Sequence, residues 1–118
     1  MNFADIQRIA LALPETETGT SYGTPAVKVR GKLLARLKED GRTMVLCAVL
    51  PDERALLMDM EPDVFHVTDH YLGYPAMLVH LARADPRQME ALLVQSWRRL
   101  ATRKALKLYD ENPARARR

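Results

Sequence analysis

Residues 26–38, Ala-Val-Lys-Val-Arg-Gly-Lys-Leu-Leu-Ala-Arg-Leu-Lys, decide the fold. Apolar residues alternate with polar ones on each side of Arg30-Gly31, and alternation with a period of two is typical of half-buried strands. The side chains expected to share a buried face are Val27 and Val29 on the first strand and Leu33, Ala35 and Leu37 on the return. The stretch therefore predicts an antiparallel hairpin with a glycine turn.

The sheet is expected to grow outward from this hairpin. A second turn at residues 39–42 leads into residues 43–49, which are apolar enough for a central strand covered on both faces. Further along, residues 64–68 and 76–81 read as two short strands, separated by a loop at residues 69–75. The first three strands should form a meander.

Helices are expected at both ends and in the middle. Apolar residues recur at helical spacing after Asn2, which can cap the first helix together with Asp5, and Pro14 ends that helix. A short helix is predicted to start at Pro51 and to stop before Pro62.

The last long helix has the clearest signature in the chain. Asp85 can cap it, Pro86 suits its first position, and Gln88 can close a capping box. One apolar face then extends to Leu100, and residues 105–109 are expected to form a further short helix.

These elements predict an α+β fold with a single antiparallel sheet of about five strands packed against helices, in the order α-β-β-β-α-β-β-α. Residues 15–25 carry no apolar repeat and are rich in Thr, Ser, Gly and Glu, so we expect a loop there, and its length makes it a candidate functional loop. Residues 1–111 should form one domain, and residues 112–118 a flexible basic tail.

Composition agrees with one globular domain. The 118 residues are 47% hydrophobic and 28% charged, which suffices for one core without disulfides or metal. Cys47 is the only cysteine, so no intramolecular disulfide can form and a reducing cytoplasm fits best. The longest apolar runs, such as residues 44–50, are too short to span a bilayer, and we expect neither a membrane span nor a secretion signal.

Positive charge is concentrated near the C-terminal end. Residues 97–118 hold eight basic and two acidic residues, so they carry +6, whereas the whole chain carries +3. Such an asymmetry points to an anionic partner such as nucleic acid or a membrane surface. The alternative is a tail that only keeps the protein soluble.

Two segments share the pattern Gly-x-Pro-Ala-x-x-Val, residues 23–29 and residues 73–79. Proline fixes φ and suits the first residue of a strand, while glycine permits backbone conformations closed to other residues. Tyr22, Tyr71 and Tyr74 flank these turns. They either pack over the ends of the sheet or form a surface that contacts a ligand.

With these motifs the chain resembles the MmcQ/YjbR-like family of small bacterial proteins. The similar segments are residues 13–15 (LPE), 21–29 (SYGTPAVKV), 31–37 (GKLLARL), 70–75 (HYLGYP) and Trp97. The resemblance covers nearly the whole chain. It implies a compact α+β fold related to secretion chaperones, with a double-wing arrangement and a predicted DNA-binding role, and it supplies no catalytic residues.

Weak, low-specificity DNA binding is accordingly the first functional expectation. Flexible cations on an exposed hairpin can contact phosphates, although Glu39 and Asp40 at the second turn would repel them. The candidate phosphate contacts are Lys28, Arg30, Lys32, Arg36 and Lys38 in the hairpin, and Arg98, Arg99, Arg103, Lys104 and Lys107 near the C-terminal end. The competing interpretation is a solvated hairpin face whose lysines protect a sheet edge.

The alternative function is recognition of a protein or a small ligand between the two Gly-x-Pro segments. This requires the two segments to meet at one end of the sheet. The residues concerned are Tyr22, Gly23, Thr24, Pro25, His70, Tyr71, Gly73, Tyr74 and Pro75.

Enzymatic chemistry has little support in the sequence, and we expect no cofactor and no metal. His66 and His70 are spaced for one helix face but fall on and after a predicted strand. Cys47 lies within an apolar run and reads as a small buried side chain rather than a nucleophile. Neither a nucleophile elbow nor a phosphate-binding glycine loop occurs.

Overall fold

The computed structural model describes residues 1–111 and confirms the α+β class. Four helices accompany the sheet in this part of the chain: α1 (Phe3–Leu11), α2 (Pro51–Met60), α3 (Pro86–Leu100) and α4 (Arg103–Glu111). The strands are β1 (Thr16–Ser21), β2 (Thr24–Val29), β3 (Lys32–Leu37), β4 (Thr43–Cys47), β5 (Phe65–His66) and β6 (Ala76–His80). Two short 3-10 helices, η1 (Asp69–Tyr71) and η2 (Leu81–Arg83), flank β6. The predicted basic tail at 112–118 lies outside the described residues.

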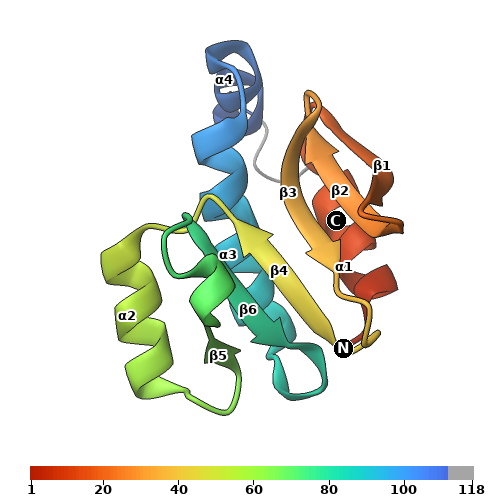
Figure 1. The fold of residues 1–118 in the computed structure, drawn as a ribbon. Coiled ribbons are helices and arrows are strands. Elements are labelled where there is room, and N and C mark those ends of the chain that lie inside the picture. The colour runs from red at the N-terminus through yellow and green to blue at the C-terminus, as the bar shows by residue number, and fades with distance from the viewer. Residues whose placement is uncertain (112–118) are drawn as a thin grey trace.

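All strand pairs are antiparallel, and the strand order across the sheet is β1-β2-β3-β4-β6-β5. The predicted meander is thus confirmed, and β6 lies beside β4 with the short β5 at the edge (Figure 1). Arg30 and Gly31 both have positive φ, 52° and 81°, as expected of a two-residue hairpin turn whose twist matches that of the strands.

The two faces of the sheet are covered differently. Helices α1 and α3 pack on one face, where Met44, Leu46 and Trp97 belong to the main core. On the opposite face, Val45 and Leu78 belong to a second, smaller cluster, and η1 lies over it (Figure 1). Side chains of β4 therefore alternate between two buried layers, as predicted for a central strand.

The sheet has six strands rather than about five, because residues 16–21 form β1 and not a loop. Strand β1 pairs with β2 from Thr16↔Val29 to Ser21↔Thr24. It is an edge strand whose side chains are half-buried or exposed throughout, so it shows none of the apolar alternation by which strands are recognised. Backbone pairing rather than side-chain burial makes this segment a strand.

The predicted buried face of β3 is wrong at one position. Val27 pairs with Ala35 and Lys28 with Leu33, so Leu34 is the extra residue of a β-bulge. A bulge turns the following side chains relative to those before it. As a result Leu34 and Ala35 join the main core, while Leu33 faces the opposite side of the sheet.

The helix caps agree with the sequence except in one detail. Asn2 and Asp5 form the capping box of α1, and the Asp85 carboxylate accepts a hydrogen bond from the backbone nitrogen of Gln88 at 3.0 Å. The side chain of Gln88 does not close the box, because it donates instead to the Glu61 carboxylate at 2.6 Å. Gln88 thus ties α3 to the segment that follows α2.

Candidate functional site

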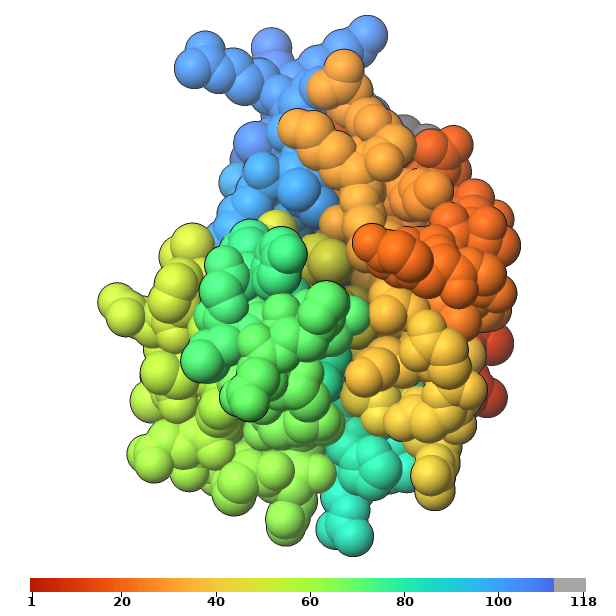
Figure 2. Space-filling model, in the orientation of Figure 1, coloured from red at the N-terminus to blue at the C-terminus, as the bar shows by residue number. Residues whose placement is uncertain are grey.

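The two Gly-x-Pro segments lie on either side of one cavity. The cavity has a volume of about 430 Å³ and opens on the sheet face opposite α1 and α3. Figure 2 shows the green segment that contains η1 and the orange β1–β2 turn on opposite sides of this hollow. The lining residues are Tyr22, Leu33, Arg36, Val45, Cys47, Ala48, His70, Tyr71, Tyr74, Pro75, Ala76 and Leu100. We call this cavity the tyrosine pocket.

The first Gly-x-Pro segment begins with a tight turn. Tyr22 and Gly23 both have positive φ, 53° and 78°, which joins β1 to β2 through two residues. The Tyr22 ring is 85% exposed at the rim of the pocket. Gly73 in the second segment has no positive φ, so the expectation that both glycines serve an unusual backbone conformation holds only for the first.

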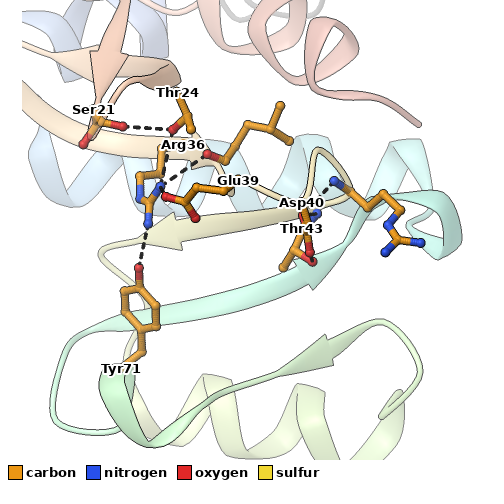
Figure 3. A network of polar contacts seen from close by, with 9 residues as sticks. Ser21, Thr24, Arg36, Glu39, Asp40, Thr43 and Tyr71 are labelled. Carbon is orange, nitrogen blue, oxygen red and sulfur yellow. Dashed lines mark hydrogen bonds and ion pairs between the residues drawn. The ribbon is translucent and has the colours of Figure 1, made fainter.

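The Arg36 guanidinium lies between Thr24 of the first segment and Tyr71, which precedes the second (Figure 3). Its Nη1 donates to the Thr24 hydroxyl at 3.3 Å, and its Nη2 donates to the Tyr71 hydroxyl at 3.0 Å. The side chain is only 7% exposed, and its ion pair is with Glu39 at 3.3 Å. Burial disfavours the charged form of Arg36, but the hydrogen bond to Tyr71 and the contact with Glu39 outweigh it, so the pKa of Arg36 is raised.

Aromatic rings form the walls of the pocket. The Tyr22 ring lies over the Arg36 guanidinium, whose carbon is 5.1 Å from the ring centroid. His70 meets Tyr71 edge to face at a centroid distance of 4.7 Å, and Tyr74 lies 6.5 Å from Tyr71. Such edge-to-face contacts stabilise a fixed arrangement of rings.

Arg54 holds the second segment in place, a role that the sequence analysis missed. From α2, its Nη1 donates to the carbonyl oxygens of Tyr74 at 3.0 Å and Ala76 at 2.9 Å, and its Nη2 donates to that of Leu72 at 3.1 Å. A fourth, longer contact of 3.4 Å reaches the carbonyl of Tyr71. No motif marks this arginine, since its partners are backbone atoms some 20 residues later.

Cys47 lies in the floor of the pocket but is not activated. Burial raises the pKa of its thiol to about 11, and the charge of Arg36 only partly opposes this. A thiol with such a pKa is almost entirely protonated at neutral pH and is a poor nucleophile. We therefore assign Cys47 to the floor as a small, weakly polar side chain.

The predicted phosphate contacts of the hairpin fall into separate groups. Arg30 and Lys32 are exposed at the turn between β2 and β3. Lys28 is half-buried on β2, and its aliphatic chain lies beside Gly19 of β1. Arg36 is buried in the pocket wall, and the Lys38 ammonium lies 6.0 Å from the centroid of the Tyr71 ring. The hairpin thus does not present these five cations as one exposed row.

Several C-terminal cations are held by protein partners. Arg98 forms two hydrogen bonds with Asp110, at 3.0 and 3.3 Å, which raise its pKa. Arg99 donates to the Glu53 carboxylate at 2.9 Å and to the carbonyl of Ala48 at 2.7 Å. These contacts join α3 to α4 through Asp110 and to α2 through Glu53.

The other three candidate phosphate contacts near the C-terminal end, Arg103, Lys104 and Lys107, lie on α4. Lys107 lies 3.9 Å from Glu111, one helical turn further along. Arg103 and Lys104 are exposed in the first turn of the helix.

Glu15 lies between the hairpin turn and the start of α4. Its carboxylate accepts from the hydroxyl of Thr102 at 2.7 Å and from the amide nitrogen of Thr102 at 3.1 Å. These bonds, together with the nearby charges of Arg30 and Lys104, lower the pKa of Glu15. The hairpin turn with Arg30 and the start of α4 with Lys104 thus lie at the same end of the molecule, where orange and blue atoms adjoin in Figure 2.

The histidines are dispersed. His66 is exposed on β5, and partial burial together with the charge of His80 lowers its pKa. His70 lines the tyrosine pocket from η1. Within residues 1–111, no group of three or more His, Cys, Asp or Glu side chains is placed to hold a metal ion.

The described residues form one antiparallel sheet with a pocket between the two Gly-x-Pro segments. The match to the YjbR family spans residues 11–99, so the chain belongs to the YjbR family. An uncharacterized protein of Mycobacterium bovis and two of Mycobacterium tuberculosis are each 38% identical to it over 58 residues, which is 49% of this chain. The matched segment spans 44% of the length of these curated relatives.

In the described range 1–111, every helix is too short or too polar to cross a lipid bilayer.

Proposed function

We propose that this protein is a non-enzymatic binding module that takes a small molecule in the tyrosine pocket. The observation that carries the proposal is the cavity itself. Its volume of about 430 Å³ lies in the range of small-molecule sites, and its lining is mainly apolar with a few polar side chains. A reducing compartment such as the cytoplasm suits a chain with a single, unpaired cysteine.

The arrangement of the polar groups supports ligand binding over simple packing. Tyr22 and Tyr74 are 85% and 60% exposed at the rim, although tyrosines that only close the end of a sheet would be covered. Two rings left open to solvent above an apolar floor offer contact area that a flat ligand can cover.

Fragment titration followed by protein NMR tests the proposal. We expect fragments to shift the signals of Leu33 and Ala76 in the floor and to leave those of Ala91 on α3 unchanged. Tyr74→Ala should weaken binding of the best fragment about five- to tenfold, because it removes a stacking wall. Leu56→Ala, which removes an equally exposed apolar side chain from α2, is the matched control and should bind as the unmodified protein does.

Two results would contradict the proposal. One is a fragment set that shifts none of the pocket signals. The other is equal binding by the Tyr74→Ala and Leu56→Ala variants, since that would place the fragment elsewhere.

Low-specificity DNA binding is a second candidate function, supported by the exposed cations that lie near Glu15. Arg30 and Lys104 lie close enough to this carboxylate for both charges to lower its pKa. Exposed cations from two elements on one surface suit contacts to phosphates, which confer affinity without sequence preference.

Fluorescence anisotropy with labelled duplex and single-stranded DNA at about 50 and 200 mM salt tests this second candidate. The double substitution Arg30→Ala with Lys104→Ala should weaken binding on all sequences and reduce the salt slope by about 1 for each phosphate that the variant no longer neutralises. Arg83→Ala, an exposed arginine on η2, serves as the control. Absence of binding at the lower salt, or an equally weakened control, would overturn this candidate.

A further inference from the structure

We infer that the tyrosine pocket selects flat aromatic anions and that Arg36 and Tyr71 receive their carboxylate. This inference rests on the proposed small-molecule function of the same pocket and names its ligand class. Arg36 is the arginine that lines this cavity, and the Tyr71 hydroxyl lies 3.0 Å from its Nη2.

The charge of Arg36 is only weakly compensated. Among the described residues its ion-pair partner is Glu39, through a single contact of 3.3 Å, and the Glu39 side chain is 64% exposed. The other acceptors are neutral oxygens of Thr24, Leu37 and Tyr71. A buried cation is stable when it is paired, so an additional anion would be favoured beside this guanidinium.

The geometry of the guanidinium suits a carboxylate. Nη1 shares its hydrogens among three acceptors at 3.3 to 3.4 Å, longer than the usual range for charge-assisted bonds. Within residues 1–111, Nη2 makes one bond, to Tyr71, although it carries two hydrogens. Arg36 therefore retains capacity to donate to an incoming oxygen.

Tyr71 supplies a second donor next to the first. Its hydroxyl oxygen accepts from Arg36 at 3.0 Å, which leaves the hydroxyl proton free to be donated. None of the hydrogen bonds within residues 1–111 uses that proton. Figure 3 shows the Tyr71 ring rising from η1 with its hydroxyl directed at Arg36, so both donors lie at the same point.

The walls favour a flat ring. Tyr22 lies over the guanidinium, and His70, Tyr71 and Tyr74 are mutually tilted with centroids 4.7 to 6.5 Å apart. Flat ligands can stack on such faces while their edges contact the apolar floor. A volume of about 430 Å³ accommodates one or two fused rings.

The surrounding charges discriminate against cations. Lys38 lies with its ammonium 6.0 Å from the Tyr71 ring and so adds positive charge beside Arg36. Glu39 opposes an incoming anion, but its exposed carboxylate can turn into water when Arg36 takes a new partner.

Three probes with one ring system and different charge test the inference: 2-naphthoate, 2-naphthamide and 2-naphthylmethylammonium. Titration followed by NMR signals of Leu33 and Ala76 should give the carboxylate at least about tenfold tighter binding than the amide, with the ammonium weakest, because hydrogen bonds between ions exceed neutral ones. Tyr71→Phe, which removes only the hydroxyl, should reduce the preference for the carboxylate severalfold.

Arg36→Lys keeps the charge but loses the planar fork, so the preference should fall about tenfold while the amide binds as before. Arg42→Lys, an exposed arginine on the neighbouring turn, is the matched control. If Arg36→Lys fails to fold, the Tyr71→Phe result decides.

The outcomes separate this inference from the function on which it rests. Equal binding of the three probes in the pocket, or an unchanged preference in Tyr71→Phe, overturns the anion selectivity and leaves the small-molecule function intact. If no probe and no fragment shifts the NMR signals of the pocket, both the anion selectivity and the small-molecule function are overturned.

Discussion

Substitution of Arg54 by alanine is expected to lower the free energy of unfolding by about 2–3 kcal/mol and to loosen the segment from Tyr71 to Ala76. The arginine donates to four backbone carbonyls of this segment, and hydrogen bonds from a charged donor contribute more than neutral ones. Urea unfolding measures the first effect, and amide hydrogen exchange across the segment measures the second.

Two further variants isolate the cause. Arg54→Lys keeps the charge, but an ammonium lacks the planar fork with which the guanidinium reaches four carbonyls. This variant should therefore recover less than half of the free energy of unfolding that Arg54→Ala loses. Arg83→Ala removes an exposed arginine from η2 and should change the stability by no more than about 0.5 kcal/mol. Unchanged hydrogen exchange in Arg54→Ala would show that Arg54 does not hold the wall of the tyrosine pocket.

Trp97→Ala is expected to have the largest effect on stability, a decrease of about 3–5 kcal/mol. Trp97 is fully buried in the main core, its indole nitrogen donates to the Pro14 carbonyl at 2.8 Å, and its ring lies 5.2 Å from that of Tyr109. The substitution leaves a cavity in the main core and leaves the half-buried Pro14 carbonyl without its donor. Thermal unfolding by calorimetry measures the decrease.

Trp97→Phe separates packing from hydrogen bonding at the same site. It keeps an aromatic ring beside Tyr109 but leaves the Pro14 carbonyl without its donor, so an intermediate decrease of about 1–3 kcal/mol is expected. A Phe variant as unstable as the Ala variant would contradict the packing argument. A variant as stable as the unmodified protein would show that the hydrogen bond contributes little.

Much of the fold can be predicted from the sequence, because burial and caps leave patterns in it. The structure confirms three features that depend on local residue types: the hairpin at Arg30-Gly31, the cap at Asp85 and a central strand, predicted at residues 43–49 and found at Thr43–Cys47. Strand β1 could not be found in this way, since edge pairing with β2 needs no apolar side chains. The bulge at Leu34 was also missed, because alternation is assumed to continue along a strand.

The pocket could be anticipated in part. The repeated Gly-x-Pro pattern with flanking tyrosines singled out both walls, and the structure places Tyr22 and Tyr74 around one cavity. The role of Arg36 was assigned differently, as an exposed phosphate contact, because a basic residue in an alternating hairpin is expected to face water. Its burial depends on Tyr71, which is 35 residues away and which no local pattern connects to it.

The way in which Arg54 holds its loop leaves the side chains of that loop free to change. Carbonyl oxygens are common to all amino acids, so the attachment places no demand on which residues occupy positions 72 and 74. Position 74 lines the tyrosine pocket, so replacements there can alter what the pocket accepts while the loop keeps its path. Position 74 is therefore suited to redesigning the ligand selectivity proposed for the pocket.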